Sequence, residues 1–219
     1  MFKNRKLRIV LANIIAYVPT NILRCSLYKT LFGYDIRNSI IGWKTVIVVD
    51  SAKLDSCRIG RNNRFTGPFR FVMEANASID KSNVFECGWW VIEPQHASTV
   101  YSRSLLLKEN SLITSHHYFD LAGTIEIGTN TWIAGLQSQF WTHGAGSTKT
   151  TVLIGDDCYI GSASRFAPGS VIGNRCLVAM SSTITKNFST DECVIAGTPA
   201  SIKKENYYWR HAKSQTKSS

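Results

Sequence analysis

The chain has 219 residues, an apolar content of 44% and a formal net charge of +10. This length predicts one domain with short appendages, and its core is large enough to fold without a disulfide or a metal. The basic excess lies at the ends: residues 1–37 hold seven basic residues and one acidic residue, and residues 200–219 hold five and one. The body between them has 13 residues of each sign, which argues against a nucleic-acid groove along it.

Residues 2–32 are predicted to form two helices that break at Pro19. Four basic residues precede an apolar run at 9–18, which is too short to span a bilayer and is followed by no signal-peptide cleavage pattern. Two interpretations of residues 1–34 stay open. The segment is either a cap that packs on the domain that follows, or an interfacial segment on the cytoplasmic leaflet with its basic side chains toward anionic lipid.

Apolar residues then recur every six positions. A first phase contains Ile41, Ile47, Lys53, Ile59, Phe65, Phe71 and Ala77, of which only Lys53 is polar. A second phase contains Ile79, Phe85 and Val91; the region 96–112 is irregular and is expected to be a loop; the repeat then resumes at Ile113, Phe119 and Ile125. Such a fixed period dictates the architecture.

The repeat is most regular from Ile154 to Ser189, where six consecutive hexads begin with an apolar residue. A period of six matches neither a helix nor a simple strand. It fits a three-sided prism in which about three hexads close one coil and each leading side chain points inward. The small fifth residue also points inward, and two of the six cysteines (Cys158 and Cys176) hold this place as core fillers in a reducing compartment. The predicted fold class is therefore all-β, a parallel β-helix over 35–200.

The segment Trp141–Thr150 interrupts the repeat, because Gln139 to Ile154 is three residues longer than two hexads. It is rich in Gly, Ser and Thr, as a loop should be, and loops on a rigid scaffold often carry function. Two aromatic pairs, Trp89-Trp90 and Phe140-Trp141, either stack on a sugar or place one ring of each pair in the core. After a last strand at 194–200, residues 201–213 are predicted to form a short C-terminal helix, within an appendage of 201–219.

Three motifs resemble the C-terminal signature of the hexapeptide-repeat acyltransferases: Ile160-Gly161-Ser162, Val178–Lys186 and Ala196-Gly197-Thr198-Pro199-Ala200. The chain is most similar to the maltose/galactoside O-acetyltransferase branch and its surface-polysaccharide relatives, well over 110–204 and only as a repeat over 36–95. The resemblance implies a left-handed parallel β-helix, a homotrimer, acetyl-CoA bound in clefts between neighbouring coils, and a histidine as the catalytic base.

The resemblance also implies roles for single residues. His143 in Phe140-Trp141-Thr142-His143 matches the catalytic histidine, and Asp120 matches an aspartate that precedes an Ile-x-Ile-Gly hexad. His116 and His117 are candidates to contact the acceptor or to act as the base instead. Expected acetyl-CoA contacts are Ser162, Met180, Thr185, Lys186 and Lys204, although Met180 replaces the usual Ala or Gly and Ser201 replaces an Arg of some members.

The expected reaction is direct attack of a saccharide hydroxyl on acetyl-CoA with His143 as general base, without a metal or a covalent enzyme intermediate. The expected setting is surface polysaccharide biosynthesis (capsule, O-antigen or exopolysaccharide) in the cytoplasm or at the cytoplasmic face of the membrane, on a saccharide or lipid-linked oligosaccharide. One alternative is N-acetylation of an amino sugar on a nucleotide sugar. Others are a non-catalytic scaffold, or a metal site between subunits built from His116, His117 and His143, as in γ-type carbonic anhydrases.

Overall fold

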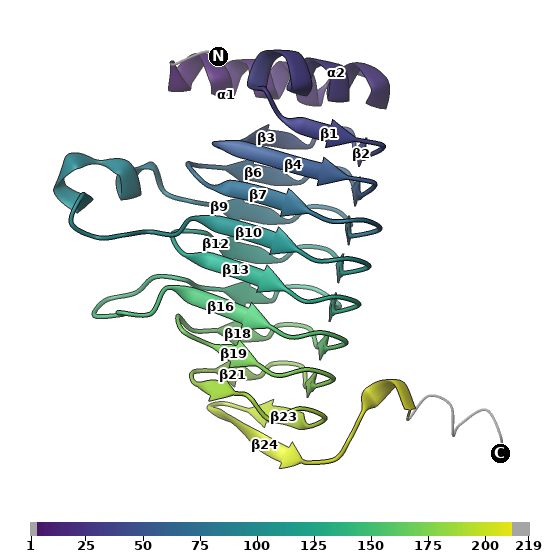
Figure 1. Ribbon diagram of the computed structural model, residues 1–219, viewed down its shortest axis with the longest axis vertical. Coiled ribbons are helices and arrows are strands. Elements are labelled where there is room, and N and C mark those ends of the chain that lie inside the picture. The colour runs from purple at the N-terminus through teal and green to yellow at the C-terminus, as the bar shows by residue number, and fades with distance from the viewer. Residues whose placement is uncertain (1–3, 212–219) are drawn as a thin grey trace.

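A computed structural model describes residues 4–211 of the chain (Figure 1). Two helices, α1 (Arg5–Ala16) and α2 (Asn21–Phe32), precede a stack of coils in which each coil contributes one short strand to each of three sheets. Every strand pair is parallel except the last, β23 with β24. The three sheets are the faces of a triangular prism, so the predicted all-β parallel β-helix with helical ends is confirmed.

The three faces are named sheets A, B and C, and their strands lie in the following spatial order. Sheet A contains β1 (Asp35–Arg37), β4 (Ser51–Asp55), β7 (Arg70–Met73), β10 (Ser104–Leu107), β13 (Thr124–Ile127), β16 (Thr151–Ile154), β19 (Val171–Ile172) and β22 (Asn187–Phe188). Sheet B contains β2 (Ile40–Ile41), β5 (Arg58–Ile59), β8 (Ser78–Ile79), β11 (Leu112–Ile113), β14 (Trp132–Ile133), β17 (Tyr159–Ile160), β20 (Leu177–Val178), β23 (Val194–Gly197) and β24 (Ala200–Lys204). Sheet C contains β3 (Val46–Val48), β6 (Arg64–Thr66), β9 (Val84–Glu86), β12 (Tyr118–Asp120), β15 (Gln139–Phe140), β18 (Arg165–Phe166) and β21 (Thr183–Ile184).

The hexad rule is visible in a column of buried phenylalanines inside sheet C. Phe65, Phe85, Phe119, Phe140 and Phe166 lie in register on neighbouring strands, and successive rings stack with centroids 4.4 to 4.7 Å apart. Burying each side chain contributes about 1.5–3 kcal/mol, and each stacked pair adds about 0.5–1.5 kcal/mol. Stacking between coils therefore stabilises the prism, which a single coil could not do alone.

The simple six-residue count fails at one place in the first phase. Lys53 was expected at an inward position, but it is exposed, and its neighbour Leu54 is fully buried instead. Strand β4 is five residues long and buries both Ala52 and Leu54, so the inward register there moves by one residue. A charged side chain is kept in water by this shift.

The corners of the prism follow from the strand order. The C–A edge holds the turns that lead from sheet C to sheet A, and the B–C edge holds the turns from sheet B to sheet C. Two long excursions, 87–103 and 141–150, leave the same C–A edge and project to one side (Figure 1). The second was predicted; the first contains the short 3-10 helices η1 (Trp89–Ile92) and η2 (Pro94–His96), and the loop expected over 96–112 ends earlier, at β10.

Helices α1 and α2 lie across the first coil and are separated at the predicted break beside Pro19. The cap supplies hydrogen-bond partners for four backbone amides of the first coil, which has no earlier strand to pair with. At 2.8–3.0 Å, Lys44 N donates to Ala16 O, Ile41 N to Asn21 Oδ1, Ile47 N to Tyr28 Oη, and Val49 N to Tyr34 Oη. The open end of the β-helix is thereby closed, which removes an edge that would invite pairing with another chain. Lys3, the first residue of the predicted basic cluster, lies outside the described residues.

The other end of the prism differs from the prediction. Residues 200–204 form strand β24, which pairs antiparallel with β23, so the helix predicted from residue 201 is wrong over this part. Helical conformation begins only at Trp209 and is described as far as His211. The Trp209 ring packs on sheet B against Trp132 and Tyr159, with centroids 5.7 and 5.2 Å away. The end of the predicted tail, from residue 212, lies outside the described residues.

Candidate active site

A histidine–carboxylate pair lies at the C–A edge, where both excursions leave the coil. His143 belongs to the excursion 141–150, and Asp120 is the last residue of β12, on the coil before it. The two side chains meet with His143 Nδ1 2.7 Å from Asp120 Oδ2. The Asp120 side chain is 5% exposed and the His143 side chain 40% exposed, so the pair has a buried end and an open end.

The carboxylate of Asp120 is fixed by several donors besides the imidazole. Its Oδ2 accepts from the backbone N–H groups of Thr142 and His143, at 2.9 and 3.1 Å, and from the Thr142 hydroxyl at 3.0 Å. Thr142 Oγ1 in turn accepts from Gly123 N at 2.7 Å. Gly123 is required there, because a Cβ would collide with the carbonyl oxygen of Thr150. The network ties the root of the excursion to the preceding coil.

This geometry defines the tautomer of His143. An ionised carboxylate only accepts hydrogen bonds, so Nδ1 carries the hydrogen that points at Asp120. Nε2 then has the lone pair, and no described residue forms a hydrogen bond with it. A partly exposed imidazole with a basic Nε2 and a buried orienting carboxylate is the arrangement of a general base.

The first excursion covers the imidazole. The Trp90 ring lies 5.2 Å from the His143 ring, between centroids, and Trp90 also packs edge-on against His96 and Tyr101. Below, the Trp141 ring packs on Tyr118 at 5.0 Å on the outer face of sheet C. Of the two aromatic pairs, Phe140-Trp141 places Phe140 in the core and Trp141 outside, as one of the two interpretations predicted. In the other pair, Trp89 and Trp90 are both half-buried.

His117 lies inside the prism at the B–C edge. It is 1% exposed, its Nδ1 accepts from Ser138 N at 3.1 Å, and its Nε2 donates to Thr114 Oγ1 at 3.0 Å. Burial lowers the pKa of His117 to about 4, so the ring is neutral near pH 7. Both ring nitrogens are engaged, and a base at this place has no access to a substrate. His116 is exposed at the same turn, on an edge of the prism other than that of His143.

The expected acetyl-CoA contacts divide between the edges. Ser162 and Met180 lie at the B–C edge, on successive coils, and Met180 is 69% exposed. Thr185 and Lys186 lie at the C–A edge, two coils beyond His143, and both are exposed. Lys204 is the last residue of β24, opposite Val194 at the far side of sheet B. One chain therefore brings together Asp120 and His143, but it places Ser162, Met180 and Lys204 elsewhere.

The described residues contain no group of three or more His, Cys, Asp or Glu side chains that could hold a metal ion. The three histidines of the metal alternative lie on different edges or point inward, as described for His117. All six cysteines are buried and form no disulfide, and burial, with the charge of Asp120 as a further cause, raises the pKa of Cys87 to about 12. A thiol with this pKa is not a nucleophile near pH 7.

The comparisons with known proteins agree on the architecture. Residues 151–186 match the family model described as bacterial transferase hexapeptide (six repeats). The polySia-specific acetyltransferase NeuO superposes with a TM-score of 0.51 at 16% identity, covering 85% of this chain and 92% of that one. This chain has the hexapeptide-repeat β-helix fold of that structure. The predicted resemblance and the left-handed parallel β-helix are thereby confirmed.

A second structure with this hexapeptide-repeat fold is an acetyltransferase from Vibrio cholerae, with a TM-score of 0.50 at 18% identity, covering 92% of this chain and 90% of that chain. The same Vibrio cholerae O1 biovar eltor protein complexed with acetyl coenzyme A has a TM-score of 0.51 at 18% identity, covering 92% and 86%. No curated protein sequence is significantly similar to this chain. At these identities the neighbours establish the fold alone.

The sequence did not predict two residues that contact the His143–Asp120 pair, Trp90 and Thr142. The contact of Trp90 with His143 joins excursions that are 53 residues apart, and no periodic signal connects them. The role of Thr142 was also missed, although its place beside His143 in the quoted motif was a usable signal. The inward position of His117 follows from the hexad rule itself, because it is the fifth residue of the hexad that begins at Ile113.

Proposed function

We propose that this protein transfers an acetyl group from acetyl-CoA to a saccharide hydroxyl in surface polysaccharide biosynthesis, with His143 as general base. The observation that carries the proposal is the 2.7 Å contact between His143 Nδ1 and Asp120 Oδ2, at an edge of the hexapeptide prism that two excursions enclose. It leaves a basic nitrogen on an exposed side chain while the carboxylate stays buried. A general base that a carboxylate orients is what the attack of a hydroxyl on a thioester needs.

The residues act in a simple sequence. Acetyl-CoA supplies an activated acetyl thioester when it is bound. His143 Nε2 accepts the proton of the acceptor hydroxyl as its oxygen attacks the thioester carbonyl carbon. Asp120 holds the ring in place through Nδ1–H and stabilises the imidazolium that forms. His143 then returns the proton to the departing thiol sulfur, which restores the neutral base and leaves an acetyl ester on the acceptor.

The B–C edge suits the pantetheine part of acetyl-CoA. Ser162 lies between two exposed apolar side chains, Leu136 on the coil before and Met180 on the coil after, and its Oγ accepts from Leu136 N at 3.4 Å. A strip of apolar side chains with interspersed small polar groups matches a chain that alternates methylene and amide groups. Lys186 and Lys204 offer cations for phosphates, each with its Nζ near an aromatic ring and in no ion pair among residues 4–211.

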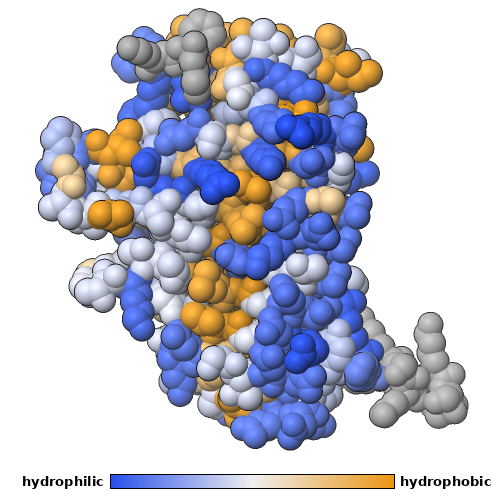
Figure 2. All heavy atoms as spheres, in the orientation of Figure 1, coloured by the Kyte–Doolittle hydropathy of each residue, from blue (hydrophilic) through white to orange (hydrophobic). Residues whose placement is uncertain are grey.

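We infer that the complete site needs a second copy of the chain, within a homotrimer. The outer face of sheet A carries Val72, Leu106, Leu153 and Val171 on successive strands, interrupted only by Glu126. Figure 2 shows apolar surface running down this face. Packing sheet A of one copy on sheet B of the next, around a threefold axis, buries this band. It also brings the C–A edge with His143 beside the neighbour's B–C edge with Ser162 and Met180.

We further infer that the helical cap rests on an anionic membrane surface at the cytoplasmic face. Helices α1 and α2 expose Val10, Ile14, Ile22 and Leu23, of which Ile14 is 61% and Ile22 80% exposed. From Arg5 to Gly33 the chain has basic residues and no acidic one. No helix among the described residues is long and apolar enough to cross a membrane. Exposed aliphatic side chains with basic neighbours suit shallow insertion among anionic lipids, where a lipid-linked acceptor would be found.

The proposed activity is tested by incubating the protein with acetyl-CoA and a panel of oligosaccharides that offer hydroxyl or amino acceptors, and by measuring free CoA thiol and product mass. The expected product gains one acetyl group that mild alkali removes, as an ester requires. An alkali-stable product would show N-acetylation instead, and the absence of any acetylated glycan would contradict the proposal.

A further inference from the structure

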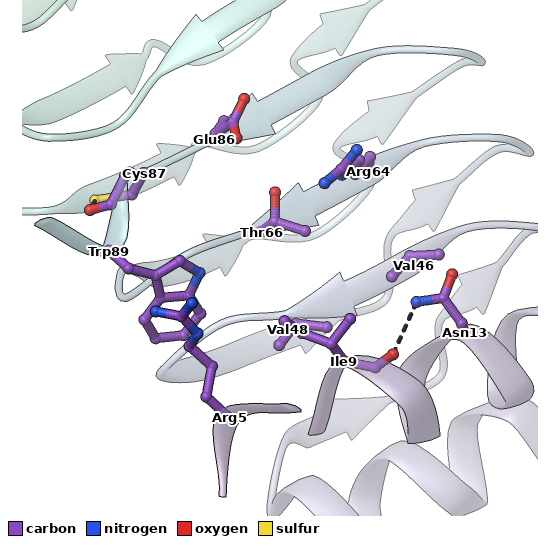
Figure 3. Close-up of a pocket in the computed structure, with 11 residues that line it drawn as sticks. Arg5, Ile9, Asn13, Val46, Val48, Arg64, Thr66, Glu86, Cys87 and Trp89 are labelled. Carbon is purple, nitrogen blue, oxygen red and sulfur yellow. Dashed lines mark hydrogen bonds between the residues drawn. The ribbon is translucent and has the colours of Figure 1, made fainter. Parts of the chain in front are cut away.

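A cavity of about 480 Å³ lies between helix α1 and the outer face of sheet C, away from the His143–Asp120 pair (Figure 3). Its floor is formed by β3, β6 and β9, one side by Ile9 and Asn13 of α1, and its end by the turn at 87–89. A volume in this range is typical of sites for small ligands. The acyl-transfer mechanism described above does not use this cavity.

The cavity combines an apolar floor with two arginines that belong to no ion pair among residues 4–211. Val46, Val48 and Ile9 supply the apolar surface. The Arg5 guanidinium lies over the Trp89 ring, 5.1 Å from its centroid, and this contact fixes the guanidinium at the mouth (Figure 3). Arg64 also lines the cavity.

Within the described chain, neither arginine belongs to an ion pair, and the carboxylate of Glu86 has none either. Two cations and one anion leave the lining with an excess positive charge. Guanidinium groups bind carboxylate and phosphate oxygens through paired N–H donors. The cavity therefore favours a ligand with an anionic group.

Thr66 adds an unsatisfied hydroxyl to the same wall. Its Oγ1 is buried and has no hydrogen-bond partner among residues 4–211. Buried polar atoms in folded proteins almost always have a partner, and an exception calls for an explanation. A hydroxyl or ring oxygen of a ligand in the cavity would provide one. An anionic group beside hydroxyl groups is the chemistry of an acidic sugar.

The cavity and the candidate active site are connected through two elements. Trp89 closes the cavity, and the next residue, Trp90, covers the ring of His143. Glu86 lines the cavity and lies in register with Asp120 on the neighbouring strand of sheet C. A linear saccharide along sheet C could thus place one unit in the cavity and a nearby unit at His143.

We propose that this cavity binds an acidic sugar unit of the acceptor, through Arg64, Arg5 and the Thr66 hydroxyl. The inference rests on the proposed function, because the ligand is taken to be part of the acceptor of that reaction. Binding of the ligand to the cavity requires no acetyl transfer. It names the acceptor class as an anionic saccharide and separates the unit that is recognised from the unit that is acetylated.

The test is calorimetric titration of the full chain with oligomers of sialic acid, of galacturonic acid and, as the neutral comparison, of maltose units. We expect saturable binding of at least one acidic oligomer, and binding about tenfold or more weaker for the neutral one, as loss of charged hydrogen bonds predicts. Arg64→Ala should weaken acidic binding about tenfold or more. Arg61→Ala, which removes an exposed arginine that does not line the cavity, is the matched control and should bind as the wild type does.

The second variant, Thr66→Val, separates a loss of binding from a loss of folding. It keeps the shape of the side chain and removes a hydroxyl that has no hydrogen-bond partner among residues 4–211. It should weaken acidic binding several-fold and leave the thermal midpoint unchanged or raised. Three outcomes overturn the inference. They are equal affinity of the wild type for acidic and neutral oligomers, no saturable binding of any of the three oligomers, and wild-type affinity in both Arg64→Ala and Thr66→Val. If the wild type transfers acetyl groups but binds no acidic oligomer, only this inference is contradicted. If His143→Ala binds an acidic oligomer but the wild type transfers no acetyl group, only the proposed activity is contradicted.

Discussion

Asp120 Oδ2 and His143 Nδ1 are 2.7 Å apart, although the residues are separated by 23 positions and belong to different coils. The coil period makes this contact possible, because it places the end of β12 directly beside the root of the excursion 141–150. Asp120 fixes both the backbone of this root and the tautomer of the imidazole. A change at Asp120 should therefore affect the base without touching the substrate.

The substitution Asp120→Asn tests this positioning role. An amide can donate to Nδ1, which would move the hydrogen of His143 to Nε2 and remove the lone pair that accepts the substrate proton. We expect kcat to fall by about 10²-fold or more, within the range that general base catalysis contributes, with little change in the KM for acetyl-CoA. Steady-state kinetics with thiol detection, beside circular dichroism to verify the fold, provides the measurement. A folded Asp120→Asn protein with wild-type kcat contradicts the role.

Complementation between variants tests whether two copies build one site. His143→Ala removes the base at the C–A edge, and Met180→Glu places a charge at the exposed B–C edge. Each homo-oligomer should be inactive or strongly impaired, whereas a mixture that is unfolded and refolded together should recover activity at interfaces with two intact edges. Light scattering gives the oligomeric state. A monomeric wild type, or no recovery in a mixture shown to exchange subunits, contradicts the shared site.

The buried His117 predicts a loss of stability in acid. Its pKa in the folded protein is lowered to about 4 by burial, compared with about 6.5 in an unfolded chain. Between these values the unfolded chain binds a proton that the folded protein does not bind, so the free energy of unfolding decreases as the pH falls from about 6.5 to about 4. The contribution is on the order of 3 kcal/mol, since one pKa unit corresponds to 1.36 kcal/mol.

The comparison variant for this prediction is His117→Asn, because Asn63 and Asn83 occupy the equivalent inward place on the two preceding coils and share its hydrogen-bond column. Urea unfolding at pH 7 and pH 4.5 should show a larger loss in the wild type than in the variant. Equal losses would show that His117 does not titrate as its burial implies.

Binding to vesicles tests the membrane surface of the cap. The double substitution Val10→Ser with Ile14→Ser removes apolar area from the exposed face of α1, and each buried methylene contributes about 0.8 kcal/mol to such binding. We expect the wild type to co-sediment with vesicles that contain anionic phosphatidylglycerol, and less with purely zwitterionic vesicles. The double variant should bind at least tenfold more weakly.

The control for the vesicle experiment is Val100→Ser, which changes a residue that is 89% exposed in the excursion 87–103 and does not belong to α1 or α2. It should bind vesicles as the wild type does. Equal binding by all three proteins, or concentration-dependent self-association of the wild type that the double variant abolishes, would assign the apolar face to a role other than lipid contact.

The fold could be predicted from the sequence because the hexad rule is a rule about burial. Side chains such as Phe140 and Phe166 must stack on their equivalents one coil away, so their spacing records the geometry of the prism. The rule is weakest where a coil changes length, and Lys53 was misplaced there. Strand β24 was also missed, because it pairs antiparallel at the end of the stack and is not part of the repeat.

The candidate site was only partly predictable. The interruption of the repeat before Ile154 revealed the excursion that carries His143, because an extra length of chain must leave the coil. The edge on which a residue lies depends on every insertion before it, so the separation of Ser162 from His143 was not evident. The lid over the imidazole depends on a contact between Trp90 and His143 that only the folded chain brings together.

The central claim is that His143 Nε2 accepts the proton of the acceptor hydroxyl, and kcat of His143→Ala tests it most directly. The measurement is CoA thiol release with an acceptor that the wild type acetylates, for both proteins in the same oligomeric state and with the same circular dichroism. We predict a fall in kcat of about 10²- to 10⁴-fold, as expected for the loss of a general base. A folded His143→Ala protein that retains the wild-type kcat would contradict the account.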